Sequence, residues 1–300
     1  MEHIRNVTRQ FSTGDRAVLH LEARSGTVIV EGRQGDRVVV DATVRVWSDI
    51  AAEADDAAAL VERAMEQDGH RVIVRAPSLT TSERGLLAHL GLRASSVDYR
   101  VHVPLRTAVR VLSRSGSVRV AGTEGLVHIE ALSGRVMIED VNGDVTLASR
   151  SGSVSAERIT GDLRANARSG RLVVRHVRGS VEAESRSGSV EVEHVTGGLR
   201  ISASSGSISL AEVAGRLYVR SKAGSVRYRG AIVDDADIEA HAGSITLAVD
   251  PDRPFFIDAE SHVGSVRSDL PPRPNGAVPS RGGPRVRLRT RAGSIRLTRA

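Results

Sequence analysis

Hydrophobic and polar residues alternate along most of the chain, in short runs that end at glycine. Between residues 114 and 230 the motif Ser/Ala-Gly-Ser/Arg, followed by Val, Ile or Leu, recurs every 18 residues. A second glycine follows nine residues after most of the motif glycines. Alternation with period two is typical of strands with one buried face. A fixed period made of two such halves predicts one coil of a β-solenoid per repeat. The motif glycines are Gly116, Gly134, Gly152, Gly170, Gly188, Gly206 and Gly224.

The apolar residues occupy the same places in every coil. Numbered from the residue two before the motif glycine, positions 5, 7, 10, 14 and 16 are apolar and most of the others are polar. We expect these five positions to fill the interior of the solenoid, and the glycines to lie at corners that need a positive φ or a close approach of stacked backbones. In two successive coils the inward residues are Leu172, Val174, Val177, Val181 and Ala183, then Val190, Val192, Val195, Leu199 and Ile201.

The first 96 residues carry the repeat in interrupted form. The segment Arg24–Val30 already has the motif, which predicts that the solenoid starts near the N-terminus. A helix is then expected from about residue 49 to about residue 67, with Ser48 or Asp49 as its N-cap. Its apolar side would pack on the flank or end of the solenoid. That side consists of Ile50, Ala54, Ala57, Val61 and Ala64.

A second insertion, at residues 76–96, is irregular. Ser82 could cap a short helix there and Gly91 could end it, with Leu86, Leu87 and Leu90 on one side. These leucines either contact a partner or membrane, or form a lid over the open core of the first coil, and we favour the lid. Regular repeats are then predicted for residues 97–300.

The coils lengthen after residue 230. Spacings of 19, 21 and 29 residues separate the later motif glycines, and a proline-rich loop at 270–284 predicts neither strand nor helix. The segment after that loop is expected to form the last coil. Its arginines either hold phosphates or protect the exposed edge from stacking, and we favour edge protection. They are Arg285, Arg287, Arg289 and Arg291.

Composition removes several classes of function. There is no cysteine, which excludes disulfides and thiolate metal sites, and no Gly-Gly-x-Gly-x-Asp repeat, so we expect neither calcium nor a cofactor. The net charge of +6 comes from 41 arginines and the single lysine Lys222. The segment Met1–Asn6 lacks the apolar stretch of a signal peptide, and no run approaches the ~18 residues of a spanning helix. A cytoplasmic location without a membrane span is the default expectation, with envelope association left open.

The repeated Arg-Ser-Gly-Ser-Val with intervening Val-x-Gly-x-Val/Leu, the entry strand ending at Pro104 and the closing segment Arg291–Leu297 resemble the bacterial DUF4097 family of β-strand-repeat proteins, also labelled adhesins. The likeness covers nearly the whole chain and is strongest over residues 97–300. It implies a single-stranded, right-handed β-helix and, for some members, an association with cell-envelope stress. It implies no catalytic residue.

One outward column, at position 1 of successive coils, is mostly basic. Stacked about 4.8 Å apart, its side chains would form a basic edge along which an anionic polymer such as an acidic glycan could lie. Acidic neighbours argue against this interpretation. Leu132 and Ser204 interrupt the column. The candidate ligand residues are Arg114, Arg150, Arg168, Arg186, Lys222, His241, His262 and Arg291.

Other columns predict structure rather than chemistry. Position 15 runs Arg164, Glu182, Arg200, and position 8 runs Glu157, Arg175, Glu193, which predicts ion pairs between coils. At position 9, two histidines on consecutive coils could hold zinc or copper together with a carboxylate, although a solvated corner column is the favoured interpretation. The position-9 residues concerned are Asp140, His176, His194 and Glu212.

We therefore predict a non-enzymatic scaffold or adhesin-like binding protein that recognises a partner protein or an anionic envelope polymer. Nucleic acid is disfavoured because no aromatic residues are interleaved with the arginines. Two alternatives stay open: self-association into a filament, and, less favoured, a polysaccharide-acting β-helix enzyme. The enzyme would need carboxylates that converge in a cleft, whereas this sequence spreads its acids along ladders.

Overall fold

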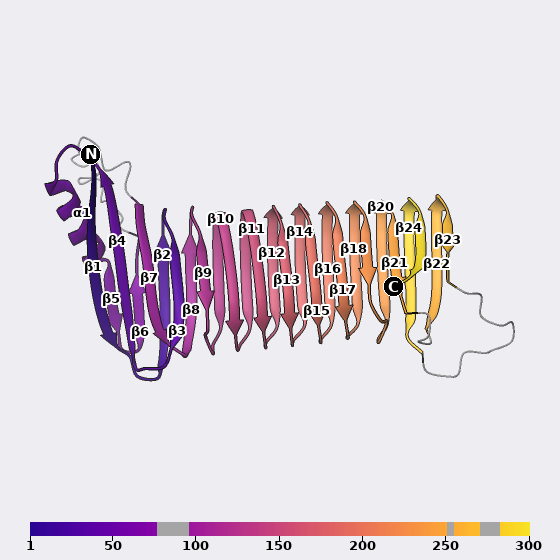
Figure 1. The fold of residues 1–300 in the computed structure, drawn as a ribbon, viewed down its shortest axis with the longest axis horizontal. Coiled ribbons are helices and arrows are strands. Elements are labelled where there is room, and N and C mark those ends of the chain that lie inside the picture. The colour runs from indigo at the N-terminus through magenta and orange to yellow at the C-terminus, as the bar shows by residue number, and fades with distance from the viewer. Residues whose placement is uncertain (77–95, 251–254, 271–282) are drawn as a thin grey trace. The chain divides into compact units, whose positions relative to one another are not determined.

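The computed structural model describes residues 1–76, 96–250, 255–270 and 283–300. It divides into two compact units, Met1–Ala148 and Ser149–Ala300. Apart from one helix, the regular structure of the described residues consists of strands, and each unit stacks coils of a β-solenoid (Figure 1). The predicted fold class is therefore confirmed.

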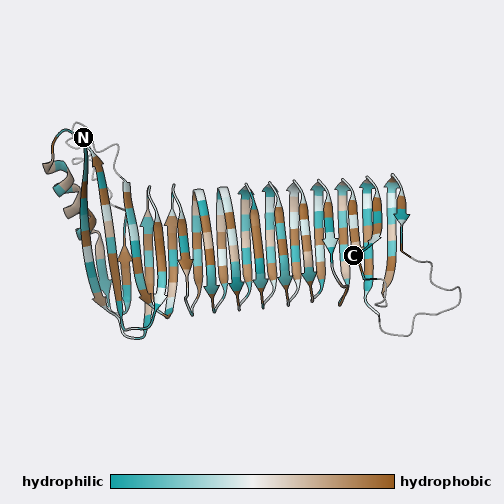
Figure 2. Cartoon of the chain, viewed as in Figure 1, coloured by the Kyte–Doolittle hydropathy of each residue, from teal (hydrophilic) through white to brown (hydrophobic). Residues whose placement is uncertain are grey.

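The second unit is the more regular of the two. Its strands form two parallel stacks in which residues 18 apart are paired, for example Leu172 with Val190 and Val181 with Leu199. Alternating hydropathy along these strands is visible in Figure 2. The strands are β11 (Val145–Ile159), β12 (Leu163–Ser169), β13 (Leu172–Val177), β14 (Val181–Ser187), β15 (Val190–Val195), β16 (Leu199–Ser205), β17 (Ile208–Val213), β18 (Leu217–Ala223), β19 (Val226–Arg229), β20 (Ala236–Ala242) and β21 (Ile245–Val249).

The predicted interior positions are buried. All ten inward residues of the coils that start at Arg168 and Arg186 are at most 2% exposed. Small aliphatic side chains suffice here because each coil covers the next, so the interior is a narrow stack rather than a broad core. The inward positions predicted from the 18-residue period are thus confirmed.

The motif glycines form the corners for two reasons. Gly170, for example, has a φ of +117°, and a Cβ there would overlap the carbonyl oxygen of Gly152 in the preceding coil. The glycine nine residues later meets only the second requirement: Gly179 lacks a positive φ, but its Cβ would lie 2.6 Å from the carbonyl carbon of Gly161. Gly170 therefore shows both predicted roles of glycine, and Gly179 shows the close approach of backbones alone.

Position 9 of five coils holds a non-glycine residue in the left-handed region, with φ between 51° and 57°. Between inward positions 7 and 10 two residues face outward rather than one, and the positive φ turns position 10 back to the interior as a β-bulge does. L-residues pay about 1–2 kcal/mol for this conformation. The five residues are Asp140, Arg158, His176, His194 and Glu212.

We expect this strain to reverse the usual ranking of alanine and glycine. In His176→Gly the free energy of unfolding should be about 1 kcal/mol higher than in His176→Ala. Both variants lose the same imidazole, so urea unfolding compares the backbone alone. At Asn166, an exposed strand position with ordinary φ, alanine should be the more stable by about 0.5–1 kcal/mol. Alanine proving better at both sites would contradict the proposed strain.

The order of the last two coils differs from their order in the sequence. Strand β24 (Arg285–Ala292) pairs with β20 on one side and with β22 (Phe256–Val263) on the other. In the opposite stack β25 (Ile295–Arg299) likewise lies between β21 and β23 (Val266–Ser268). Figure 1 shows β24 between β20 and β22. The expectation that the C-terminal segment forms the exposed end is therefore wrong, and with it the edge-protection role of its arginines.

Charge explains this order. Strand β20 carries Asp237 and Glu239 outward, and β22 carries Asp258 and Glu260 at the same register. Stacked in sequence order, the two acidic strands would face each other, which is unfavourable for cross-strand pairs. Four outward arginines on β24 instead place a basic strand between them.

In the first unit, β2 (Arg16–Ala23) and β3 (Val28–Arg33) pair in parallel with β8 (Arg106–Ser113) and β9 (Val118–Ala121). The predicted early start of the solenoid, followed by an interruption, is thus confirmed. Among the described residues the interruption involves three antiparallel pairings, of β4 with β1 and with β7, and of β5 with β6. The remaining strands are β1 (Glu2–Ser12), β4 (Arg37–Trp47), β5 (Met65–Asp68), β6 (Arg71–Val74), β7 (Ser96–Pro104) and β10 (Val127–Val141).

The inserted helix α1 (Ala52–Arg63) is shorter than predicted, and its cap differs. Its N-cap residue is Ala51, which makes no side-chain hydrogen bond, so neither Ser48 nor Asp49 fills that role. The segment expected to continue the helix is strand β5, which forms a hairpin with β6 around Gly69, where φ is +58°. A two-residue loop with glycine in its first place, here Gly69 before His70, favours this hairpin over a further helical turn.

The helix packs against β1 and β4, as its apolar side predicted. Ala54, Ala57 and Val61 are buried, whereas Ile50 precedes the helix and is 53% exposed. The leucine-containing insertion at 76–96 and most of the proline-rich loop lie outside the described residues.

Candidate functional site

The basic edge lies on the outward face of one stack of strands in the second unit. Arg168 is next to Arg186 because their flanking residues are paired across β12 and β14. Arg150 precedes Arg168 by one coil, as the stacked glycines two residues further on show. All three side chains are exposed, and none makes an ion pair with a described residue. We call Arg150, Arg168 and Arg186 the arginine column.

Ser204 interrupts the edge, which then continues over four further strands. Registers place Lys222 beside His241, His241 beside Arg291, and Arg291 beside His262. Because β24 is inserted, Arg291 lies between the two histidines rather than after them. These three side chains, with Glu239, Glu260 and Arg289, line a shallow cavity of about 460 Å³.

Arg114 belongs to the first unit and is exposed there. The residue beside it in the next coil is Leu132, 45% exposed, so the basic edge does not continue through that coil. The structure thus brings the predicted residues together in two groups in the second unit, and places Arg114 in neither.

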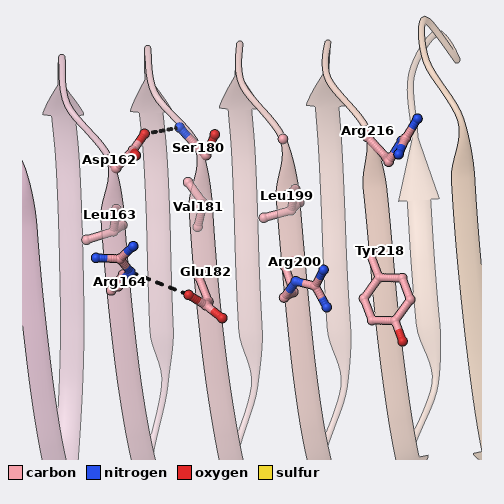
Figure 3. A pocket seen from close by; sticks show the side chains of 11 residues that line it. Asp162, Leu163, Arg164, Ser180, Val181, Glu182, Leu199, Arg200, Arg216 and Tyr218 are labelled. Atoms are coloured by element: carbon pink, nitrogen blue, oxygen red, sulfur yellow. Dashed lines mark hydrogen bonds and ion pairs between the residues drawn. The ribbon is translucent and has the colours of Figure 1, made fainter.

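Figure 3 shows a groove of about 290 Å³. Its residues Arg164 and Glu182 alternate along β12 and β14 in step with Arg168 and Arg186, so the groove lies on the same outward face as the arginine column. It opens where Gly198 has no side chain, between Ser180 and Arg216 at the corresponding position of the neighbouring coils. Its apolar lining comes from Leu163, Val181 and Leu199, and its polar lining from Asp162, Arg164, Ser180, Glu182, Arg200, Arg216 and Tyr218.

Two arginines lie against the ring of the tyrosine in this groove. The guanidinium carbon of Arg200 lies 4.6 Å from the centroid of the Tyr218 ring, and that of Arg220 lies 4.9 Å from it. Such cation–π contacts hold Arg200 in place without a carboxylate partner.

Several predicted ion pairs form, and others are replaced. In the position-15 column Arg164 contacts Glu182 at 3.5 Å, as expected, but Arg200 turns to Tyr218. In the position-8 column the Arg175 Nε donates to Glu193 at 3.0 Å. Glu157 pairs with Arg158 instead.

On the stack of strands opposite the arginine column, Arg175 is an arginine that is paired with carboxylates. The hydrogen bond to Glu193, together with the negative charge of Glu191, raises the pKa of the Arg175 guanidinium. Its donors are committed to the protein. No described carboxylate pairs with the arginine column in this way, so its guanidinium groups are available to contact a ligand.

The two histidines at position 9 do form a close pair. Their rings stack with centroids 4.8 Å apart and 13° between the planes. Ring-nitrogen lone pairs lie in the ring plane, so parallel stacked rings do not aim at one common ion. Among the described residues no group of three or more His, Asp or Glu could hold a metal ion.

Sequence reasoning missed the groove and its tyrosine. The available signals were Gly198 at a position that is polar in most coils, and Tyr218 as one of only three tyrosines. The length and polarity of α1 leave the described chain without a helix that could cross a membrane.

Among the comparisons with known proteins, a family match covers most of the chain. No curated protein matches the chain. A solved structure from Clostridium sporogenes, described as a "putative cell adhesion protein", is 9% identical, with 99% of this chain and 100% of that chain covered and a TM-score of 0.24. The family model described as Toastrack DUF4097 matches residues 19–297. The chain therefore belongs to the Toastrack DUF4097 family.

Proposed function

We propose that the protein is a non-enzymatic binding scaffold whose arginine column holds an anionic polymer. The observation that carries this proposal is that Arg150, Arg168 and Arg186 are exposed, stacked on successive coils and free of ion pairs with described residues. Leaving like charges about 4.8 Å apart costs stability unless a ligand or counterion lies along them. A linear polyanion would satisfy all three at once.

The surroundings extend the surface in the same direction. Arg200, held over Tyr218, lies in the groove on this face and adds a further guanidinium that no described carboxylate pairs with. Two carboxylates on the face are engaged in ion pairs, Glu182 with Arg164 and Glu239 with Arg220, rather than converging as a catalytic pair would. These features support a binding surface of repeated cationic contacts over a hydrolytic site.

A triple variant tests the proposal. In Arg150→Gln, Arg168→Gln, Arg186→Gln we expect retention on immobilised heparin and on immobilised polyphosphate to fall, and to depend less steeply on salt, because fewer counterions are exchanged. The melting temperature should stay the same or rise slightly, since the side chains removed are exposed and mutually repulsive.

The matched control removes the same charge elsewhere. Arg178, Arg227 and Arg229 belong to the same unit, are exposed and make no ion pair with a described residue. Changing these three to glutamine should leave retention nearly intact. An equal loss in both triple variants would mean that net charge, rather than the column, drives binding, and unchanged retention in the first variant would remove the proposal.

A further inference from the structure

The second unit ends in a coil that is covered on one side only. Within the described residues β22 pairs with β24 alone, and β23 pairs with β25 alone. The other edge of each strand therefore presents backbone N–H and C=O groups without a strand partner, which is a template for strand addition. We call the uncovered side of β22 and β23 the open end.

Apolar side chains are exposed at the open end. Val266 is 45% exposed, whereas Ile295 and Ile245, which occupy the same inward position in the next two coils, are fully buried. Ile257 is only half-buried, although its neighbour Val286 is 1% exposed. Each inner coil is sealed by the coil beside it, so the interior is incomplete where that coil is missing.

The charges at the open end select the chemistry of an occupant. On this face the strands alternate in sign: Arg220 of β18 contacts Glu239 of β20 at 3.3 Å, and Arg289 of β24 contacts Glu260 of β22 at 3.8 Å. Asp258 contacts Arg287 at 3.8 Å in the same way. The next strand in this series would be basic.

Strand β24 shows what such a strand looks like. Its sequence, Arg-Val-Arg-Leu-Arg-Thr-Arg-Ala, alternates arginine with mostly aliphatic residues, and it lies between two acidic strands with Val286 and Leu288 buried. A second copy of the open end would bring Asp258 and Glu260 against acidic residues of its own kind, which disfavours pairing of two such ends.

We propose that the open end binds an extended segment of a partner protein in which arginine or lysine alternates with aliphatic residues. The backbone of the segment pairs with the free edge, its basic side chains lie opposite Asp258 and Glu260, and its aliphatic side chains cover Ile257 and Val266. This surface differs from the arginine column in charge and in place, so either can fail without the other.

A synthetic peptide with the sequence of residues 285–299 is the probe. Titrated in labelled form against the full chain, it should bind saturably. A peptide of the same composition with its arginines clustered should bind about tenfold more weakly or worse, because it loses the alternation. No binding of the alternating peptide, or equal binding of both, would overturn the proposal.

Two variants of the full chain locate the contact. Val266→Asp should weaken binding about tenfold or more, because the aspartate would be buried against aliphatic residues of the peptide. Val263→Asp is the control: it makes the same change at a corner position that is 63% exposed and whose neighbour Ala292 is also exposed. Equal urea midpoints for the two variants establish that both remain folded.

Three other outcomes would also overturn the proposal. Equal peptide affinity in both variants would place the contact elsewhere. Binding accompanied by loss of hydrogen-exchange protection over residues 285–299 would mean that the peptide replaces β24 rather than adding to β22. Concentration-dependent dimerisation that Val266→Asp abolishes would make a second copy the occupant.

Discussion

Replacing Gly188 by alanine is expected to lower the free energy of unfolding by about 3 kcal/mol or more. Gly188 has a φ of +138°, and an added Cβ would overlap the carbonyl oxygen of Gly170 and lie 2.8 Å from its carbonyl carbon and 3.0 Å from its nitrogen. All three atoms belong to backbone that is itself stacked on the preceding coil, so the neighbour cannot yield without moving the stack. The urea midpoint measures the loss.

Gly35 separates steric overlap from backbone strain. Its φ of +151° is similar, but an added Cβ would meet no atom within 4 Å. Gly35→Ala should therefore cost only the strain of a positive φ, about 1–2 kcal/mol. If the two substitutions lowered the free energy of unfolding equally, close stacking of the corners would not be the reason that residue 188 must be glycine.

The 18-residue period carries most of the information on the fold. Leu172, Val190 and Ile208 recur at position 5 and are buried side by side, because a repeat that returns to the same place in each coil fixes register and interior together. The same pattern also contains a signal for the residues with positive φ at position 9. Inward positions 7 and 10, as at Val174 and Val177, already break the period of two and indicate a bulge.

Two features were out of reach because they depend on contacts between distant segments. The length of α1 depends on a hairpin that turns at Gly69, which helical propensity alone does not reveal. The place of β24 depends on which strand best complements the acidic residues of β20 and β22. The order of strands in the sequence does not show whether β22 or β24 pairs with β20. The four alternating arginines of β24 and the acidic residues of its neighbours can nevertheless be read from the sequence.

The candidate site shows the same division. Arg150, Arg168 and Arg186 could be aligned from the period alone, since they share one position on successive coils. Whether a charged side chain forms an ion pair depends on which of several equally close neighbours it contacts, and the period does not determine this. Arg200 was expected to join Glu182, and instead it lies over Tyr218, while Arg164 takes the carboxylate.

A chain that ends at residue 282 is expected to lose the structure of β22 and β23 as well as that of the deleted strands. The described strands that pair with this coil are β24 and β25 alone, so deletion removes every such partner while leaving residues 256–268 in the chain. Hydrogen exchange should show fast exchange over residues 256–268 and continued protection over the inner strands β16 to β18. The deletion of 18 residues would thus also unfold residues 256–268, which remain in the chain.

In the truncated chain, charge repulsion is expected to prevent the coil formed by β22 and β23 from pairing directly with β20 and β21. In that arrangement Asp258 would face Asp237 and Glu260 would face Glu239, since both pairs share their registers with Arg287 and Arg289. Adding Asp258→Arg and Glu260→Arg to the truncated chain converts these contacts into opposite-charge pairs, and we expect it to restore protection over residues 256–268. Matched Asp258→Asn and Glu260→Gln changes remove the repulsion without adding attraction, and should restore less. Full protection in the truncated chain without any of these changes would show that shape rather than charge determines which strand follows β20.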